Sequence, residues 1–378
     1  MTRVAPLSKA QKVAALARQR LSRLSDDLVF YNSFNGRFTD SPRAVHEVLQ
    51  SRRPDLRSVW LGDGDGFPPD VPTVAPGSAD YFREVGRARW VIANFMMPAY
   101  APRRGVTYVQ TWHGTPLKKI GYDNPRYSRD DRGLRRSARD YAQWDFLVSQ
   151  NRFSTEIFRR AFRFEGEVLE VGYPRNDVLS SPGRDAIRRA VRAELGIDDD
   201  VQVLLYAPTF RDDQKDASGR LAFPLAIDLA RMQEALGGRF VVLLRLHHWV
   251  SAGLGPLPEQ FCRDVSDRRD INELYLASDV LLTDYSSVMF DYAVTGKPIV
   301  YFTHDLESYR DAGRGFYFDL EAEAPGPLCR TTEELVSVLQ ESDRLAEDHA
   351  AAYRRFRDTY CYLDDGHAAE RVVERLLA

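Results

Sequence analysis

The stretch "SDVLLTDYSSVMFDYAVTGKPIVYF", residues 278–302, contains the pattern from which the whole fold can be worked out. An apolar run of strand length, Val280–Thr283, leads into a polar turn, and a helical pattern follows as far as Ala293. Gly296 and Pro298 then end the helix and open a second apolar run. A strand, a helix and a strand in this order predict two parallel strands joined by a helix that covers one face of their sheet.

The same alternation repeats along the rest of the chain. Further strand-like runs are "LVFYNSF" (28–34), "SVWLGD" (58–63), "WVIANF" (90–95), "TYVQTW" (107–112), "FLVSQ" (146–150), "VLEVGYP" (168–174), "VLLYAPTF" (203–210) and "FVVLLRLH" (240–247). The segment "SSPGRD" (180–185) separates two series. We therefore expect an α/β protein with two Rossmann-like, doubly wound parallel-sheet domains, residues 25–180 and 181–378. The C-terminal helix is expected either to stay with the second domain or to return to the first. Ligands bind at the carboxyl ends of such strands, so we expect a cleft between the domains.

Composition limits the class of protein. With 378 residues and 44% hydrophobic content, the chain is globular and too long for a single core. Its three cysteines lie far apart, which suggests neither a zinc site nor a disulfide framework and fits a reducing cytoplasm. No apolar run approaches the roughly 20 residues of a membrane span. Residues 1–180 carry 29 Lys and Arg against 20 Asp and Glu, a net of +9, and the remainder carries 23 against 35, a net of −12. The first half is therefore expected to meet something anionic.

Residues 1–24 have the pattern of a basic amphipathic helix. Val13, Leu16, Leu21 and Leu24 fall at helical spacing among lysines and arginines. Such a helix can lie on an anionic membrane surface, which would place a cytoplasmic protein peripherally at the inner face of the cell membrane. The simpler interpretation is a helix that packs on its own domain.

The stretch "QTWHGTP" (110–116) follows an apolar strand and is rich in residues that sites use. Gly114 permits close approach of the backbone, and Pro116 fixes the loop. Between them, His113 could take a proton from a hydroxyl group near neutral pH. It could equally be a structural histidine held by a loop hydrogen bond, and the spacing alone favours neither.

A run of cations begins five residues after His113. Residues 118–139 hold Lys118, Lys119 and six arginines, including Arg135 and Arg136, against three aspartates. Such runs are usually solvated faces, but this one is placed where an anionic acceptor could bind. It has no zinc-finger spacing, basic zipper or aromatic RNA-binding signature, so nucleic acid is not an expected partner.

The second domain offers two segments that suit an anion. Arg245 and His247 share one face of a strand-like run, and a guanidinium beside an imidazole suits a phosphate or diphosphate. Ser286 and Ser287 fall in the first turn of the helix after the strand, where hydroxyl groups and free amides bind anions. A surface histidine and an ordinary helix cap are the plainer interpretations.

Several segments together resemble one known family. They are "LVFYNSFNGRFTDSPRAV", "QTWHGTPLKKIGYD", "VGYPRND", "LLYAPTFRDD", "DINELYLASDVLLTDYSSVMFDYAVTGKPIVYF", "RGFYFD" and "DDGHAAERVVERL". The family is that of the CDP-glycerol glycerophosphotransferases, which prime and extend teichoic acids and some capsule polymers. The resemblance runs from about residue 28 to the end. It implies two Rossmann-like domains in the GT-B arrangement, with the nucleotide on the second.

The resemblance also implies roles for particular residues. Two important histidines of the family map to His113 and His247, and the neighbouring His248 keeps the choice at the second position open. The segment Thr283–Ser287, which includes Asp284, is implied to bind the diphosphate.

The resulting hypothesis is the transfer of a polyol phosphate from CDP-glycerol or CDP-ribitol, with release of CMP. The acceptor would be a hydroxyl group of an anionic polyol-phosphate polymer or of a lipid-linked molecule. His113 would act as the base on that hydroxyl group. Arg245 and His247 would neutralise the diphosphate, with Arg211 as a further cation.

Cofactors and other functions stay open at this stage. The sequence demands no cofactor, but Mg²⁺ remains an option because Asp212, Asp213 and Asp284 offer carboxylates without a diagnostic spacing. The alternatives to phosphotransfer are a GT-B glycosyltransferase that uses a nucleotide sugar and a non-catalytic module that binds anionic polymers.

Overall fold

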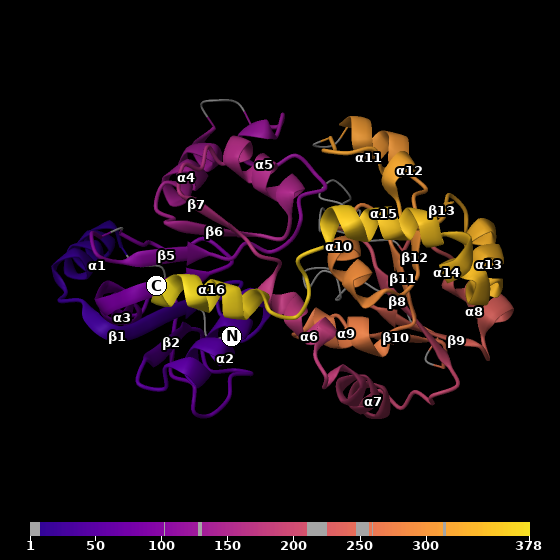
Figure 1. Ribbon diagram of the computed structural model, residues 1–378, viewed down its shortest axis with the longest axis horizontal. Helices are drawn as coiled ribbons and strands as arrows, with labels where there is room; N and C mark the ends of the chain where they lie inside the picture. Colours follow the sequence, from indigo (N-terminus) through magenta and orange to yellow (C-terminus); the bar gives the residue numbers. More distant parts are fainter. Residues whose placement is uncertain are drawn as a thin grey trace. The chain divides into compact units, whose positions relative to one another are not determined.

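The computed structural model describes residues 8–101, 103–127, 131–209, 225–246, 257–258, 260–312 and 315–378. Internal contacts divide the chain into two units. The first unit comprises Met1–His113, Gly121–Asp177 and Leu363–Ala378, and the second comprises Gly114–Ile120 and Val178–Tyr362. Each unit contains one parallel sheet with helices packed on it, which confirms the expected α/β class (Figure 1).

The first unit is built on a sheet with the strand order β3-β2-β1-β4-β5-β6-β7. Its strands are β1 (Ser25–Asn32), β2 (Arg57–Leu61), β3 (Thr73–Val74), β4 (Ala88–Ala93), β5 (Thr107–Gln110), β6 (Phe146–Ser149) and β7 (Glu167–Glu170). Its helices are α1 (Lys9–Leu21), α2 (Asp40–Arg52), α3 (Ala79–Arg87), α4 (Arg132–Tyr141), α5 (Arg152–Ala161) and α16 (Ala368–Leu377), with short 3₁₀ turns at Gly121–Asp123 and Pro174–Asn176. All strand pairs are parallel, and the direction of winding reverses between β1 and β4. This reversal is the switch point at which such sheets bind ligands.

Both ends of the described chain contribute to the core of the first unit. Val29 and Tyr31 of β1 pack in one cluster with Val372 and Val373 of α16, and all four side chains are fully buried. Helix α16 lies against α2 (Figure 1). Gly172 allows the returning chain to approach, because a Cβ atom at this position would lie 2.6 Å from the carbonyl oxygen of Leu363.

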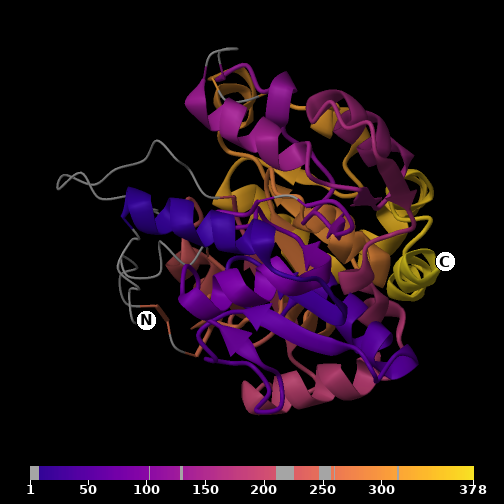
Figure 2. The same cartoon turned by 90° about the vertical axis from the view of Figure 1, so that its left-hand side faces the viewer.

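Helix α1 forms within the range that the sequence predicts, and its predicted apolar stripe is covered only in part, since Leu16 and Leu24 are half-buried. Ser8 begins the helix with a capping box, and the side chain of Gln19 is the buried contact, with hydrogen bonds to the carbonyl of Ala99 and the N–H of Ala101. Val13 and Leu21 remain 68% and 85% exposed. The helix is the indigo one in front of the first unit in Figure 2, and its neighbour is α3. The helical spacing therefore predicts only part of the face by which α1 packs.

The second unit is built on a sheet with the strand order β10-β9-β8-β11-β12-β13, again with parallel pairs only. Its strands are β8 (Gln202–Ala207), β9 (Phe240–Leu244), β10 (Cys262–Asp264), β11 (Val280–Thr283), β12 (Ile299–Phe302) and β13 (Leu328–Cys329). Its helices are α7 (Arg184–Glu194), α8 (Leu229–Leu236), α9 (Ile271–Ala277), α10 (Val288–Tyr292), α11 (Leu306–Ala312), α12 (Leu320–Glu323), α13 (Thr332–Gln340), α14 (Leu345–Asp348) and α15 (Ala350–Tyr360), with 3₁₀ turns at Ala293–Thr295 and Ser342–Arg344. Helix α6 (Asp177–Ser180) begins at the last residue of the first unit's middle segment.

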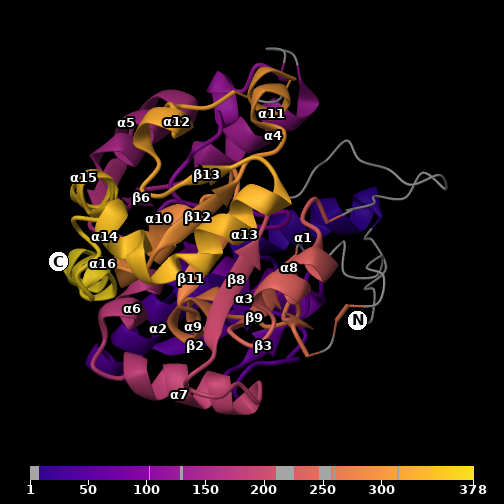
Figure 3. The same cartoon turned by 90° about the vertical axis from the view of Figure 1, so that its right-hand side faces the viewer.

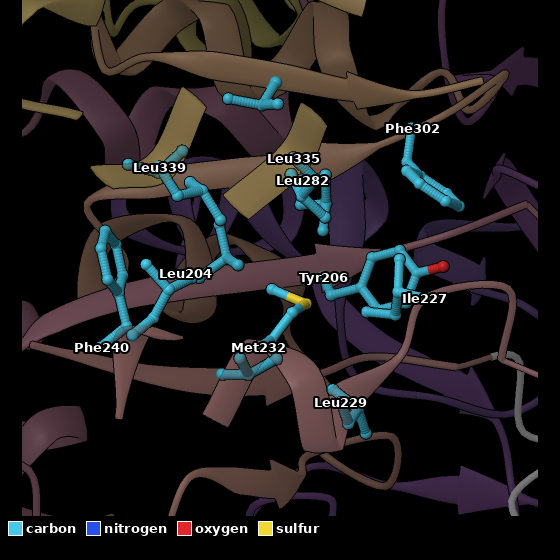
Figure 4. Close-up of a cluster of buried hydrophobic side chains, with 14 of the residues drawn as sticks. Leu204, Tyr206, Ile227, Leu229, Met232, Phe240, Leu282, Phe302, Leu335 and Leu339 are labelled. Carbon is cyan, nitrogen blue, oxygen red and sulfur yellow. The ribbon is translucent and has the colours of Figure 1, made fainter. Parts of the chain in front are cut away.

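The core of the second unit lies between its sheet and the helices α8 and α13, which are in contact with each other (Figure 3). Leu204 and Leu282 come from neighbouring strands, and Met232 and Leu335 come from the two helices (Figure 4). All four side chains are fully buried. Winding reverses between β8 and β11, so the switch point of this sheet lies at Ala207 and Thr283.

Candidate active site

His113 lies on a sharp turn just beyond β5. The side chain of Gln110 accepts the N–H of Trp112 at 3.0 Å, and Trp112 and Gly114 have φ angles of +54° and +148°. The turn places the imidazole against the carboxyl end of β4. Its Nδ1 atom lies 2.8 Å from the carbonyl oxygen of Asn94, the residue that follows that strand.

This hydrogen bond determines the tautomer of His113. A carbonyl oxygen can only accept, so Nδ1 carries the proton and Nε2 keeps its lone pair. Burial lowers the pKa of His113 below its usual value, while the carbonyl of Asn94 and the charge of Asp40 act to raise it and Arg175 acts to lower it. The imidazole is therefore neutral at pH 7 and has one nitrogen available to accept a proton.

Asp40 and Arg175 form an ion pair in the environment of His113. Arg175 Nη1 lies 3.0 Å from Asp40 Oδ2, and the two side chains are only 7% and 8% exposed. A pair removed from water in this way acts more strongly on a neighbouring titratable group than an exposed pair does. Both residues lie in segments that carry the family resemblance, "TDSPRAV" and "GYPRND", but the sequence gives no sign that they meet.

Strained backbone surrounds the same imidazole. Phe34, Asn35, Asp40 and Trp112 all have positive φ angles between 45° and 62°. Phe34 and Trp112 contact the ring of His113 directly. Residues other than glycine rarely adopt this conformation, and such residues gather at functional sites. The strain independently marks His113 as a candidate catalytic group.

In the second unit, Thr283 and Asp284 close the switch point between β8 and β11. The hydroxyl group of Thr283 donates to the carbonyl of Ala207 at 2.8 Å. Asp284 Oδ1 accepts the N–H groups of Thr209 and Tyr285 at 2.8 and 2.6 Å. Both side chains are buried, so these two predicted ligands hold the shape of the turn.

Ser286 and Ser287 follow this turn and are half-buried. Ser287 is the N-cap residue of α10, and its side chain makes no capping hydrogen bond. Ser286 Oγ lies 3.5 Å from the N–H of Val288. Helix α10 has only five residues, so the two hydroxyl groups offer more to an anion here than the helix dipole does.

Arg245 follows β9, which ends at Leu244 and is therefore shorter than the run over 240–247 suggests. Its Nη1 atom donates to the carbonyls of Val265 and Ser266 at 3.0 and 2.9 Å, and to that of Arg268. This nitrogen therefore stabilises the loop that contains Val265, Ser266 and Arg268. His247, His248, Arg211, Asp212 and Asp213 lie outside the described residues.

Lys118 and Lys119 have their contacts within the second unit. Lys118 Nζ donates to the hydroxyl group of Tyr309 at 3.1 Å, and the ring of Tyr309 stacks on that of Tyr285 at 4.3 Å. The N–H of Lys119 donates to the carbonyl of Gly315 at 3.0 Å. The segment after His113 is thereby connected to the "DYSS" turn, a link that the sequence pattern does not reveal.

Arg135 and Arg136 lie on the exposed side of α4. Leu134 and Asp140 are the buried residues of the helix. Burial raises the pKa of Asp140 to about 6. The two guanidinium groups are accessible to a polyanion.

The carboxylates of the described residues do not form a metal site. In that part of the chain there is no group of three or more His, Cys, Asp or Glu side chains that could hold an ion. Asp284, the one described member of the three candidate aspartates, uses Oδ1 to accept two N–H groups. Because Asp212 and Asp213 lie outside the described residues, Mg²⁺ stays a prediction.

Two doubly wound sheets, each with polar groups at its switch point, define a GT-B-like α/β protein. The family model of the CDP-Glycerol:Poly(glycerophosphate) glycerophosphotransferases matches residues 14–378. The chain belongs to this family.

Characterised relatives cover most of the chain. It is 37% identical over 366 residues to a teichoic acid poly(glycerol phosphate) polymerase of Bacillus spizizenii, which covers 93% of the chain and 92% of the relative. It is 37% identical over 377 residues to a teichoic acid glycerol-phosphate transferase of Staphylococcus aureus, with 94% of each covered. A Bacillus subtilis polymerase is 39% identical over 357 residues and 91% of the chain, which spans only 48% of that longer relative.

Solved structures of a wall teichoic acid polymerase have the same fold as this chain. The wall teichoic acid polymerase TagF aligns with a TM-score of 0.90 and 34% identity, over 97% of this chain and 92% of the other. UDP-GlcNAc 2-epimerase from Neisseria meningitidis, at 12% identity and a TM-score of 0.54, covers 93% of this chain and 99% of its own, and shares the fold alone.

Proposed function

We propose that this protein transfers glycerol phosphate from CDP-glycerol to a hydroxyl group of a teichoic-acid-like polymer or a lipid-linked acceptor, and releases CMP. The acceptor oxygen attacks the phosphorus atom bonded to glycerol, and the bond from that phosphorus to the bridging oxygen of the diphosphate breaks. The proton of the hydroxyl group passes to Nε2 of His113. CMP leaves with the bridging oxygen.

The observation that carries the proposal is the state of His113. Its Nδ1–H is fixed on the carbonyl of Asn94, and burial keeps the ring neutral, so Nε2 is a base before the substrate arrives. The adjacent Asp40 carboxylate favours the imidazolium that forms when the proton is taken, while Arg175 limits this effect.

We assign the acceptor to the first unit and the donor to the second unit. The half-buried hydroxyl groups of Ser286 and Ser287, held by the Asp284 turn, are the described groups that suit a diphosphate. His247 and Arg211 remain predicted donor ligands. The exposed Arg135 and Arg136 would contact the charged part of the acceptor.

Glycerol is favoured over ribitol as the transferred polyol. The glycerol phosphate polymerases and transferase are 36–39% identical over more than 90% of the chain. A ribitol phosphate polymerase of Bacillus spizizenii is 30% identical over 73% of the chain. This contrast supports CDP-glycerol as the donor, with CDP-ribitol as the competitor to test.

We also propose that the protein acts peripherally at the inner face of the cell membrane. None of the helices in the described part of the chain is long and apolar enough to cross a bilayer. Helix α1 exposes Val13 and Leu21 together with Arg18 and Arg20, a combination that suits an anionic surface.

The test is CMP release from CDP-glycerol and from CDP-ribitol, each with a soluble acceptor analogue. We expect faster release with CDP-glycerol, and a loss of about 10²-fold or more in turnover for His113→Ala with little change in donor affinity. His349→Ala, at a half-buried histidine before α15, is the matched control and should leave turnover unchanged. No CMP from either donor, or transfer of a sugar without phosphate from a nucleotide sugar, would show that the assignment is wrong.

A further inference from the structure

Two partly exposed phenylalanines flank the proposed base. The ring centroid of Phe34 lies 5.9 Å from that of His113 at an interplanar angle of 61°, and Phe95 lies at 6.2 Å and 46°. Their side chains are 37% and 36% exposed. Trp112 stacks on the imidazole at 4.3 Å, but it also packs on Phe162 and is only half-buried, so it is less exposed than the two phenylalanines. Phe34 and Phe95 are therefore the most exposed of the three aromatic neighbours of His113.

One residue fixes the whole arrangement. The side-chain oxygen of Asn94 accepts the N–H of Phe34 at 2.9 Å, and its backbone oxygen accepts Nδ1–H of His113 at 2.8 Å. Phe95 is the next residue in the chain. Asn94 is fully buried and also donates to the hydroxyl group of Ser33 at 3.2 Å. Asn94 thus holds the backbone of Phe34 and the imidazole of His113 in place, and Phe95 follows it directly in the chain.

This arrangement is costly for the folded chain. Phe34 has a φ angle of +45° and the next residue, Asn35, one of +60°. A bulky side chain avoids this region of backbone conformation, and partly exposed rings give up part of their burial energy. If folding stability alone decided the conformation, the ring of Phe34 would be buried and its backbone would have a negative φ angle. The strain and the exposure together indicate a contact that forms only when a ligand binds.

We propose that Phe34 and Phe95 form an apolar rim that receives the C–H face of the acceptor's terminal residue and directs its hydroxyl group to Nε2 of His113. This inference rests on the proposed function and names the part of the acceptor that the site recognises. Aromatic rings pack against carbon and cannot replace the water around a phosphate. The nearest phosphate of the acceptor therefore lies beyond the rim. The recognised chemistry is a short polyol chain or one face of a sugar ring.

The rim has a second effect, because it keeps water from the imidazole. The charged groups that act on His113 are Asp40 at the start of α2 and Arg175 in the turn Pro174–Asn176, and they oppose one another. Burial is the largest influence and lowers the pKa of His113. Removal of either ring admits water, so the pKa of His113 should move up towards its usual value near 6.5.

The first experiment measures acceptor affinity without catalysis. Calorimetry gives the Kd of two soluble acceptors, one ending in glycerol phosphate units and one ending in a sugar, for Phe34→Ala, Phe95→Ala and Phe34→Leu. We expect a roughly tenfold weaker Kd for each alanine variant and a smaller loss for leucine, which keeps an apolar contact. Leu377→Ala, at a residue of similar exposure on α16, should bind as the wild type does. Weakened binding of only one acceptor identifies which terminal residue the rim accepts.

The second experiment follows the imidazole of His113 by NMR across pH 4–8 in the same variants. We expect the titration midpoint of His113 to move up in both alanine variants. If the rings have only a structural role, a variant whose melting temperature is unchanged should show no such shift. Unchanged Kd values with both acceptors overturn the proposal. Because neither readout needs turnover, absence of CMP release in the wild type would count against the proposed function alone.

Discussion

Asp364 holds the C-terminal segment on the first unit, and its replacement by alanine should destabilise that unit strongly. Asp364 Oδ2 accepts Nε2–H of Gln150 at 2.8 Å, and Oδ1 accepts the N–H of Tyr173 and Nδ2–H of Asn176, each at 3.1 Å. The carboxylate is 8% exposed, and the side chains of Gln150 and Asn176 are almost completely buried. The variant Asp364→Ala removes all three bonds in one step.

The magnitude follows from the chemistry of the three bonds. A hydrogen bond to a charged acceptor contributes about 1.5–3 kcal/mol, and bonds within one cluster do not add fully, so we expect a loss of about 3–5 kcal/mol. The adjacent Asp365 provides the control, because its carboxylate is 49% exposed and pairs with Arg371, which is 33% exposed. An ion pair of this kind contributes at most about 1 kcal/mol, so Asp365→Ala should cost far less.

Urea unfolding followed by tryptophan fluorescence can measure the difference, because four of the five tryptophans belong to the first unit. With a slope of about 2–3 kcal/mol per molar urea, the midpoint of Asp364→Ala should fall by roughly 1–2 M. Equal midpoints for Asp364→Ala and Asp365→Ala would refute the reasoning, since the two changes remove the same charge from neighbouring positions.

Three further predictions concern pH, charge and the membrane. Burial lowers the pKa of His46 to about 4, so as the pH falls from 6.5 to 4 this residue should cost the native state up to about 1.4 kcal/mol per pH unit. Burial raises the pKa of Asp140 and of Asp177 to about 6, which acts in the opposite direction in the same window. The test is therefore a difference between two urea series, in which the free energy of unfolding of the wild type should fall relative to that of His46→Gln as the pH is lowered. Replacement of both Arg135 and Arg136 by alanine should weaken the Kd of a polyanionic acceptor and reduce its salt dependence while the melting temperature stays within about 2 °C, because surface substitutions rarely change stability; an unchanged salt dependence would remove the pair from acceptor binding. Deletion of residues 1–24 should lower the fraction that sediments with anionic vesicles at low salt, and a full-length protein that ignores such vesicles would end the membrane proposal.

The fold was predictable because strand and helix patterns are local. The run Val280–Thr283 forms β11, and the helical pattern after it forms α10 and the 3₁₀ turn that follows. The strand predicted over 240–247 is longer than the one observed, because β9 ends at Leu244 and the side chain of Arg245 donates hydrogen bonds to the carbonyls of the neighbouring loop. The apolar pattern of the sequence does not show where the strand ends. Its end is set by the carbonyls of Val265 and Ser266, which lie about 20 residues further along the chain and accept from Arg245.

The packing face of α1 shows a different limit. Helical spacing marks Val13, Leu16, Leu21 and Leu24 as one stripe, yet Val13 and Leu21 are exposed and Gln19 is almost completely buried. Gln19 can be buried because Ala99 and Ala101, about 80 residues away, offer it a carbonyl and an N–H. The spacing of apolar residues within a helix gives no information about such distant hydrogen-bonding partners.

The candidate site was predictable where a motif carries its own chemistry. His113 stands out in "QTWHGTP", whereas Asp40 and Arg175, 135 residues apart in the chain, join only in the fold. The positive φ angle of Phe34 is equally invisible in the sequence, because phenylalanine is a poor choice for that conformation. The predicted roles of His247 and Arg211 stay predictions.

The shared core of β1 and α16 has a consequence for how the protein is made. During synthesis, Val29 and Tyr31 leave the ribosome early, whereas Val372 and Val373 leave it among the last residues. Until residues 363–378 have emerged, the nascent first unit has an uncovered apolar surface, so its final folding step follows the synthesis of the whole second unit. Interrupted synthesis would therefore leave that surface open to chaperones and proteases.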